Sequence, residues 1–458
     1  MMQPLAIAFL TLAAFGAPCL GSSIVRSCAS GQCDSQSSSV EEEEVTMLQV
    51  SQQMGPQKSE QKPKLDVASQ NEVEDLPSFA SFIMLHGRTY TSGTEEYKSR
   101  QALFEKRRTA VRRHNSQPNQ PWTAAVNHLT DRTEEELSKL RGWRGFARTG
   151  KSTGQVGAHA HGSRSGLSLA QMESATVPVA HTWGDLEAIK ADFDQGGCGS
   201  CWAAATMTMM NAAAEIAGNK RSFSAQDLIS CVPNPHNCGG TGGCDGATVE
   251  LALNYIASNG LRTAHESPYW GEDRACQASS LAMQDAHLSN PSSPRFSYGV
   301  ELESMIAIGQ HIIANGSAGA NLGLKYWTRL PENELAPVYT HLVQYGPVAI
   351  SVAAGSWFPY KSGIFTDCPH DAVIDHAVVL FGYGVDKSKA GDLKFWHIKN
   401  SWGPGWGENG NIRLLREDTV NCGIDSQPEA GTGCDGGPAE VEVCGTCGIL
   451  YDVVSVKM

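Results

Sequence analysis

The fold is decided by residues 195–203, QGGCGSCWA, near the middle of the chain. A glycine-rich turn there leads into an Ala- and Met-rich stretch that favours a helix as far as Gly218. Ser200 is the predicted N-cap, which places Cys201 in the first helical turn. Because the helix dipole and the unpaired amides of that turn favour a thiolate, we expect the pKa of Cys201 to be lowered towards a reactive range.

Cysteine parity points to the same residue. From residue 177 onwards the chain has eleven cysteines, and an exported domain with an odd number leaves one unpaired or pairs it between chains. Without Cys201 ten remain, enough for five bridges. Two alternatives stay open, a redox pair Cys198-x-x-Cys201 and a zinc site that adds Cys444-x-x-Cys447. Export disfavours zinc, and no βαβ pattern surrounds the redox pair.

A histidine and an asparagine later in the chain could assist such a thiolate. His376 begins an apolar, β-branched run that predicts a strand, and its imidazole could hold the thiolate and protonate a leaving amine. Residues 395–403, FWHIKNSWG, predict a strand that ends in Asn400, whose amide could accept a hydrogen bond from the imidazole. Trp402 could shield that bond from water. His397 has no neighbours with a matching role, so we interpret it as structural.

A helix with an unusual face is predicted over residues 96–115, EYKSRQALFEKRRTAVRRHN. Charged and bulky residues recur on one face at spacings of three and four, and they are Glu96, Arg100, Phe104, Arg107, Val111 and Asn115. This stripe suits a helix that crosses another helix through salt bridges. An amphipathic helix without a special role is the alternative. The motif Ala125-x-Asn127-x-Leu129-x-Asp131 and the acidic run 134–136 follow.

Together these segments resemble the papain family of cysteine peptidases. The helical stripe is similar to the signature of the inhibitory propeptide of cathepsin L-like members, with Arg107 where the family has Asn. The Ala125 motif resembles the second propeptide motif, with Ala125 and Leu129 as substitutions. The peptidase resemblance runs from about Val177 to the last residue and includes residues 403–410, GPGWGENG.

The resemblance implies the active-site roles. Cys201 would be the nucleophile, His376 the acid/base and Asn400 the residue that orients the imidazole. Gln195 would donate to the oxyanion beside the Cys201 backbone amide, and Trp402 would lie against the His–Asn pair. The implied reaction is hydrolysis of peptides and proteins through a thioester acyl-enzyme, with no cofactor and no metal. Endopeptidase action is the default, because no paired-histidine insert resembles the occluding loop of cathepsin B. A secreted binding protein that has lost catalysis is the alternative.

The implied fold is α+β with two domains, a helical left domain opened by the Cys201 helix and a β-barrel-like right domain that carries His376 and Asn400. A helical inhibitory prodomain would precede them and run backwards through the cleft as an intramolecular inhibitor. The predicted boundaries are 1–21 for a secretory signal peptide, 22–75 for a disordered Ser/Gln/Glu-rich tether, 76–150 for the propeptide, 151–176 for a linker with a processing site between Ser174 and Val177, and 177–458 for the peptidase.

Disulfides are also implied by the resemblance. Cys198 should pair with Cys244, and Cys231 with Cys276. Cys368 should pair near the end of the chain with Cys422 or Cys447, and we favour Cys447 because strand-like residues follow it to the end. Two further bridges of unassigned connectivity would use Cys238, Cys422, Cys434 and Cys444.

The pocket for the substrate residue just before the scissile one is the main specificity site of the family. Its lining matches Gly246, Ala247, Ile374 and Ala377, with Ala247 where the family has Gly. Asp452 falls near the pocket floor if Cys447 is the terminal anchor. We therefore hypothesise that the pocket accepts Arg or Lys besides bulky apolar residues.

An insertion separates the two catalytic segments. His376 lies 175 residues after Cys201, against about 130–150 in the family. The excess fits an insertion around residues 277–325, with Ser/Pro-rich loops and a second helical patch at 305–313. The sequon Asn315-Gly316-Ser317 lies within it and predicts N-glycosylation at Asn315.

Charge is unevenly distributed along the chain. The net charge of −13 over 458 residues argues against a nucleic-acid binder. Residues 76–150 hold 13 basic and 7 acidic residues, a net of +6, whereas residues 177–458 hold 16 and 30, a net of −14. We expect acid to weaken this attraction and help activation. After signal removal we expect no stable membrane insertion, a monomer, and a place in the secretory pathway, in a lysosome or acidic vacuole, or outside the cell.

Overall fold

The computed structural model describes residues 76–142, 178–277, 310–387 and 391–458, which all belong to one compact unit, Val73–Met458. The predicted signal peptide, tether and processing linker lie outside the described residues, as does most of the predicted insertion. Within these ranges, no helix is long and apolar enough to cross a membrane.

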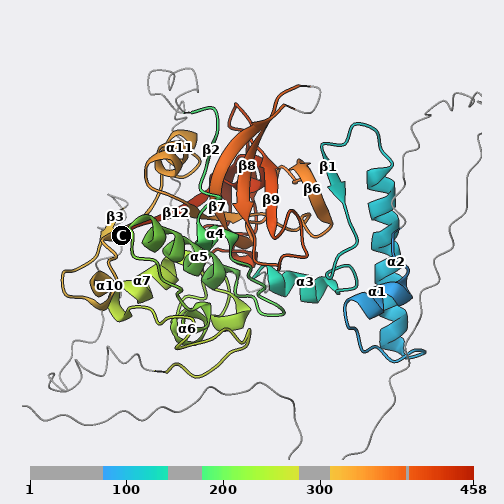
Figure 1. Cartoon of the computed structure of the whole chain (residues 1–458), viewed down its shortest axis with the longest axis horizontal. Helices are drawn as coiled ribbons and strands as arrows, with labels where there is room; N and C mark the ends of the chain where they lie inside the picture. Colours follow the sequence, from blue (N-terminus) through green and yellow to red (C-terminus); the bar gives the residue numbers. More distant parts are fainter. Residues whose placement is uncertain (1–75, 143–177, 278–309, 388–390) are drawn as a thin grey trace, which may run out of the picture. The chain divides into compact units, whose positions relative to one another are not determined.

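Residues 76–142, here called the amino-terminal segment, are mainly helical. Their elements are α1 (Phe79–Leu85), α2 (Glu95–Asn115), β1 (Trp122–Ala124) and α3 (Glu134–Leu140). The three helices begin after Ser78, Thr94 and Thr133, whose hydroxyls each accept a hydrogen bond from a first-turn amide. Figure 1 shows α1 and α2 in blue and β1 between α2 and strand β6.

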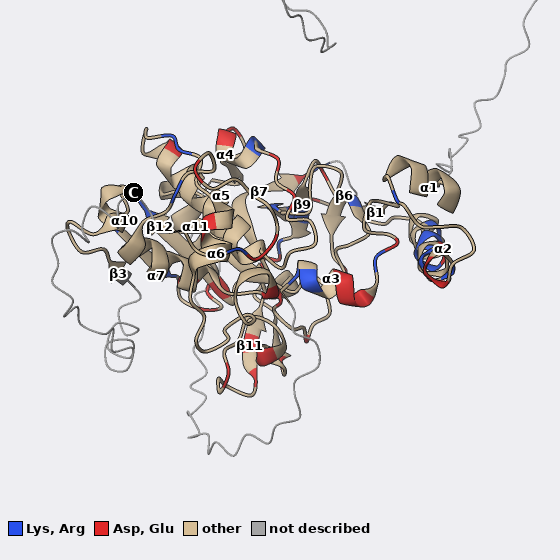
Figure 2. Cartoon of the chain, turned by 90° about the horizontal axis from the view of Figure 1, so that it is seen from below, with Lys and Arg blue, Asp and Glu red and all other residues tan. Residues whose placement is uncertain are grey.

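The predicted crossing of α2 with another helix is confirmed. Arg100 and Arg107 of α2 pair with Glu136 and Glu134 of α3. Phe104, between the two arginines on the same face, is fully buried. Figure 2 shows basic residues along α2 and acidic residues at the start of α3. The mixed stripe therefore serves two contacts, an apolar one with α1 and a charged one with α3.

A helical lobe is built around the helix that carries Cys201. Its elements are α4 (Glu187–Lys190), α5 (Cys201–Ile216), α6 (Ala225–Cys231), the turn η2 (Gly243–Asp245), α7 (Val249–Asn259) and α10 (Ala318–Asn321). α5 is the central helix, with Trp202 and Met209 fully buried. Figure 1 shows α5 in green beside strand β7, so the helical lobe meets the sheet at the first turn of α5.

The prediction that Ser200 is the N-cap of α5 is confirmed, but its side chain makes no capping hydrogen bond. Its hydroxyl bonds to the hydroxyl of Tyr269 instead (Oγ···Oη 2.7 Å). The backbone of Ser200 has φ −99° and ψ 22°, outside the extended region from which a cap side chain usually reaches the first-turn amides.

The second lobe is a large, mostly antiparallel sheet. Its strands are β2 (His181–Thr182), β3 (Gln310–Ile312), β4 (Tyr326–Arg329), β5 (Val348–Val352), β6 (Tyr360–Phe365), β7 (His376–Asp386), β8 (Leu393–Lys399), β9 (Asn411–Leu415) and β12 (Asp452–Lys457). The order is β1-β6-β9-β8-β7-β5-β12-β4-β3, with β2 on β7. This order is an open path, so the expected barrel-like domain is a sheet with two edges. Helix α11 (Leu335–Gln344) belongs to the same lobe.

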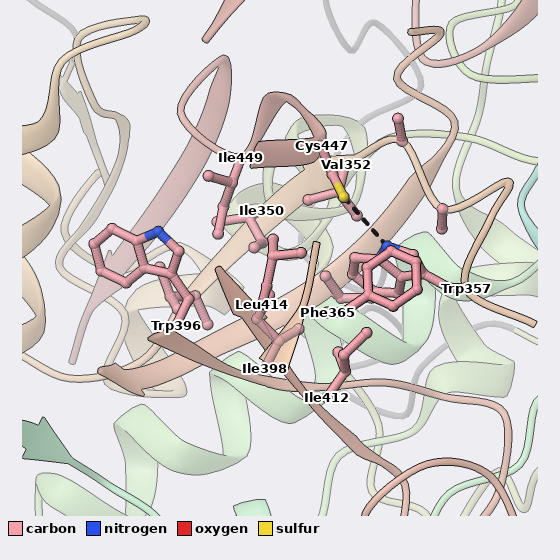
Figure 3. Close-up of a cluster of buried hydrophobic side chains, with 14 of the residues drawn as sticks. Ile350, Val352, Trp357, Phe365, Trp396, Ile398, Ile412, Leu414, Cys447 and Ile449 are labelled. Atoms are coloured by element: carbon pink, nitrogen blue, oxygen red, sulfur yellow. Dashed lines mark hydrogen bonds between the residues drawn. The ribbon is translucent and has the colours of Figure 1, made fainter. Parts of the chain in front are cut away.

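Apolar residues of the central strands form the core of this lobe. Figure 3 shows Ile350, Ile398 and Leu414 from three different strands packed beside Trp357 and Trp396. The indole of Trp357 donates to Sγ of Cys447 (3.3 Å). This bond ties the short helix η4 (Thr446–Gly448) to the sheet lobe. A second short helix, η3 (Pro428–Ala430), precedes it in the chain. The predicted strands at His376 and at residues 395–400 are confirmed as β7 and β8.

The predicted helical patch at residues 305–313 is wrong in its described part. Residues 310–312 form strand β3, which pairs with β4 at the sheet edge. Because an apolar run this short fits both helical and extended spacing, the hydrogen bonds offered by β4 decide its conformation.

Ten cysteines form five disulfides in the described part of the chain, and Cys201 is free. The bonds Cys198–Cys244, Cys231–Cys276 and Cys368–Cys447 follow the pairing that the resemblance implies. The remaining bonds are Cys238–Cys434 and Cys422–Cys444. The last of these joins β10 (Cys422–Asp425) to β11 (Val441–Cys444), a separate two-stranded hairpin.

Candidate active site

Cys201 lies where α5 meets the start of β7. Backbone amides of Ala377, Trp202 and Cys201 itself face its sulfur. Burial nevertheless raises the pKa of Cys201 to about 11, more than these amides lower it. The predicted lowering of this pKa is therefore wrong for the structure as it stands. The helix terminus does favour the thiolate, but the thiol is shut off from water, and desolvation of an anion dominates.

The imidazole of His376 lies in a polar and aromatic enclosure. Its Nε2 bonds to Oδ1 of Asn400 (2.8 Å), and the ring stacks on Trp402 with centroids 4.9 Å apart. Its buried Nδ1 has no hydrogen-bond partner among the described residues. Burial lowers the pKa of His376 to about 4, although the bond with Asn400 acts to raise it. Burial thus acts against the charged forms of both groups in this state, the thiolate of Cys201 and the imidazolium of His376.

Gln195 is the next residue of the candidate site, and hydrogen bonds fix its side-chain amide. Its Oε1 accepts from Ser401 Oγ (2.6 Å), which fixes the orientation of the amide. Its Nε2 donates to the carbonyl oxygens of Cys198 (2.8 Å) and of Leu140 (2.9 Å). Leu140 belongs to the amino-terminal segment, so a carbonyl of that segment occupies a donor that a substrate oxyanion would need.

The end of the amino-terminal segment covers Cys201. The Cys201 thiol lies 3.8 Å from the carbonyl oxygen of Arg141, and Gly142 follows beside Gly246. The guanidinium of Arg141 pairs with the buried carboxylate of Asp375, the residue that precedes His376. Neither partner of this ion pair was singled out from the sequence, because they are 234 positions apart and neither belongs to a local motif.

The same segment is held to the sheet lobe by backbone pairing. β1 pairs antiparallel with β6, with Trp122 opposite Gly363. The side chain of Asn127 donates to the carbonyl of Phe358 (2.7 Å). Asp131, the last residue of the second motif, is completely buried and accepts hydrogen bonds from Arg88 within the segment. Two residues of that motif therefore have different roles: Asn127 binds the segment to the sheet lobe, and Asp131 stabilises the fold of the segment itself.

A small pocket opens beside the thiol between the two lobes. Residues from both lobes and from the amino-terminal segment line it, and they are Arg141, Gly142, Cys201, Gly239, Ala247, Thr248, Val249, Ser351, Asp375, Ala377, Gly431 and Thr432. Two of the predicted pocket residues, Ala247 and Ala377, are among them. Gly246 lies next to Gly142 at the rim. Ile374 is completely buried in the sheet core, where it supports the pocket from behind.

Asp452 is buried under this pocket and is engaged by its own chain. Its Oδ1 pairs with Arg329 (2.9 Å) and its Oδ2 accepts from Ser351 Oγ (2.6 Å). Ser351 lines the pocket and stands between Asp452 and the space that a substrate would fill. The negative charge of Asp452 is thereby compensated within the protein.

The two cysteine alternatives do not fit these bonds. Cys198 is bonded to Cys244, Cys444 to Cys422, and Cys447 to Cys368. None of the three is a free thiol, so neither a redox pair with Cys201 nor a four-cysteine zinc site can form.

The predicted glycosylation residue, Asn315, lies exposed in the turn before α10.

Comparisons with known proteins agree with this arrangement. Residues 177–432 match the model of the papain family cysteine protease, and residues 79–137 match that of the cathepsin propeptide inhibitor domain (I29). A cathepsin L-like proteinase of Phaedon cochleariae is 26% identical over 361 residues, which cover 78% of this chain and 93% of the relative. Cysteine proteinase 3 of Solanum lycopersicum is 30% identical, with coverages of 76% and 82%. The structure of digestive procathepsin L 3 from the larval midgut of Tenebrio molitor superposes with a TM-score of 0.54 at 21% identity, over 83% of this chain and 97% of that one.

Proposed function

The chain belongs to the papain family of cysteine proteases, and on that premise we propose that it hydrolyses peptide bonds through a thioester formed on Cys201. The protein is a papain-family cysteine peptidase made as a zymogen, and its amino-terminal segment is the propeptide that blocks the active site. The observation that carries the proposal is the enclosure of His376. One ring nitrogen is held by Asn400, and the other, buried and without a described partner, is left for a thiol.

Removal of the propeptide would convert the neutral pair into the reactive one. Water would then reach the Cys201 sulfur, and the desolvation that raises its pKa would be relieved. The first-turn amides of α5 would favour the thiolate, and the proton would pass to Nδ1 of His376. Asn400 would keep the imidazolium oriented through Nε2.

The proposed reaction has two steps that share one oxyanion site. The Cys201 sulfur would attack the substrate carbonyl carbon, and the carbonyl oxygen would become an oxyanion held by Gln195 Nε2 and the Cys201 amide. Collapse of this intermediate would expel the amine, which takes its proton from His376, and leave a thioester. His376 would then deprotonate a water that attacks the thioester, which releases the carboxylic acid and restores the thiolate.

Replacing Asn400 with alanine tests the orienting role. His376 would lose the acceptor of a hydrogen bond that becomes charge-assisted during the reaction, worth about 1.5–3 kcal/mol. We expect kcat to fall by about 10–100-fold with little change in KM, measured on a fluorogenic dipeptide after acid processing. Asn411→Ala is the matched control, because the Asn411 side chain bonds only within the turn at residues 408–411. An Asn400→Ala enzyme as active as the control would contradict the role.

The Asp452 pairing changes the expected specificity of the pocket. Because both carboxylate oxygens are already engaged, a substrate Arg would bury a charge without a free partner. We expect kcat/KM with Phe or Leu before the scissile residue to exceed that with Arg by about tenfold or more. Asp452→Ala should leave this ratio within about twofold and lower the Tm, since Arg329 loses one of its three carboxylate partners, Asp452, Glu250 and Glu332. Efficient cleavage of substrates with Arg before the scissile residue, lost in Asp452→Ala, would restore the hypothesis of a pocket that accepts basic residues.

We place the protein in an exported, acidic setting. Five disulfides among the described residues persist in oxidising compartments, and the exposed turn at Asn315 is accessible to glycosylation. Amino-terminal sequencing of the acid-processed form tests the proposed boundary between Ser174 and Val177.

A further inference from the structure

Two loops from opposite lobes are joined across the pocket. A disulfide links Cys238, in the loop between α6 and α7, to Cys434, in the loop between β10 and β11. Backbone hydrogen bonds accompany it, from Gly239 N to Gly433 O (3.0 Å) and from Asp435 N to His236 O (3.0 Å). We call the joined residues 236–239 and 431–435 the strap.

Each end of the strap is anchored in its own lobe. On the helical side Gly239 packs so closely on Ala247 that a Cβ atom would lie 2.6 Å from the Ala247 carbonyl oxygen. On the sheet side Thr432 N donates to Ile374 O (2.9 Å). Because Gly239, Gly431 and Thr432 line the same pocket as Cys201, the strap closes the cleft on the side of the specificity pocket.

The positions of two propeptide residues show how much space lies between Cys201 and the strap. The carbonyl of Arg141 lies over the Cys201 sulfur, and the next residue, Gly142, already faces the carbonyl of Gly239, which would lie 3.6 Å from a Cβ added to Gly142. An extended chain advances about 3.3–3.6 Å per residue. Room therefore exists for one residue at the thiol and one in the pocket.

The propeptide leaves the extended conformation at Gly142, where it meets the strap. Gly142 has φ 71°, a left-handed conformation that residues other than glycine rarely adopt. A substrate in the extended conformation would not make this turn and would run into the strap after its second residue.

The strap is also negatively charged around its sheet-side end. Residues 422–444 contain no Lys or Arg and five acidic residues. Asp425 is buried, and the other four, Glu429, Asp435, Glu440 and Glu442, are half-buried or exposed. Figure 2 shows acidic residues around β11. A free α-amino group is positively charged at acidic pH, so a substrate that ends at the strap would bring a complementary charge.

We propose that the strap limits the cleft to two substrate residues on the amino side of the scissile bond, and that the mature enzyme releases dipeptides from free amino termini. The inference rests on the proposed peptidase function and specifies its substrate class. Internal cleavage, the default for the family, would then require the strap to be open.

A substrate series of increasing length tests the proposal. The mature enzyme is assayed on Phe-Arg-aminomethylcoumarin with a free amine, on its acetylated form and on Ala-Ala-Phe-Arg-aminomethylcoumarin. We expect kcat/KM to fall at least tenfold when Ala-Ala is added. The variant Cys238→Ser/Cys434→Ser should lose most of this difference. Cys422→Ser/Cys444→Ser, which removes a disulfide within one hairpin, should keep it.

Products from a twelve-residue peptide give a second test that needs only the wild-type enzyme. Mass spectrometry should show successive losses of two residues from the amino terminus. Internal cuts, or equal rates on the free and extended substrates, would overturn the proposal, as would an undiminished length effect in Cys238→Ser/Cys434→Ser. Enzyme that hydrolyses none of these substrates would instead contradict the proposed function. Reductant is removed before each assay, and a single free thiol, from Cys201, verifies that the strap is closed.

Discussion

The variant His376→Ala is expected to lose peptidase activity by about 10³–10⁴-fold or more in kcat, whereas His397→Ala should retain most of it. The two residues lie on the neighbouring strands β7 and β8, and burial lowers the pKa of both to about 4. Only His376 bonds to Asn400 and stacks on Trp402. His397 packs between aromatic side chains, with its ring centroid 4.3 Å from that of Phe381.

Comparing His376→Ala with His397→Ala distinguishes a loss of catalysis from the structural effect of removing an imidazole. Both variants remove an imidazole from the sheet, completely buried in His376 and partly buried in His397, so a structural effect should appear in both as a lower Tm. Because His376→Ala is expected not to process itself, the propeptide is removed from every form by an added aspartic protease before kinetics. Equal losses of kcat in the two variants at similar Tm would contradict the role of His376.

The variant Arg141→Ala is expected to release the active enzyme at neutral pH. Arg141 pairs with Asp375, the residue before His376, and both side chains are largely buried. Removing one partner of a buried pair leaves the other charge uncompensated, at a cost of about 3–5 kcal/mol. Activation of the full-length chain at pH 7 should therefore be about 10²–10³-fold faster than in the wild type. Lys139→Ala removes the same charge from an exposed position two residues away and should have little effect.

The same pair predicts how activation depends on pH. Burial raises the pKa of Asp375, and the charge of Arg141 acts in the opposite direction. On release, the loss of Arg141 acts to raise the pKa of Asp375, whereas the entry of water acts to lower it. Where the loss of Arg141 is the larger effect, release takes up a proton and is favoured as the pH falls. We expect activation to be steeply faster in acid for the wild type and nearly independent of pH for Arg141→Ala. If Arg141→Ala kept the pH profile of the wild type, the acid-sensitive contact would not be the ion pair between Arg141 and Asp375.

Carboxylates inside the propeptide are poor candidates for this switch. Partial burial acts to raise the pKa of Glu136, but its bonds with Arg100 and with Thr133 lower it to about 2. The stability that this pair contributes is present above the ordinary pKa of a glutamate and is lost only as the pH falls towards 2. We therefore expect the acid-sensitive contact to be the ion pair between Arg141 of the propeptide and Asp375 of the peptidase.

Local patterns in the sequence predicted the elements that carry the site. The helix that starts at Cys201, the strand that starts at His376 and the stripe on α2 each follow from spacing within a few turns or alternations. The pairing of Cys238 with Cys434 spans 196 positions. It depends on the contact between two loops of different lobes, so spacing along the sequence does not predict it. The raised pKa of Cys201 could not be predicted from the local sequence for a related reason. It is set by the propeptide that covers the thiol, and not by the helix that carries it.

The reactivity of Cys201 before and after propeptide removal tests the central claim most directly. The full-length chain at pH 7 and the acid-processed enzyme are each incubated with a thiol-directed epoxide, and labelled peptides are identified by mass spectrometry. Stoichiometric labelling of Cys201 in the processed enzyme and none in the full-length chain is the predicted result. Labelling to the same extent in both forms, or no labelling of Cys201 after processing, would contradict a thiol nucleophile that the propeptide holds neutral and covered.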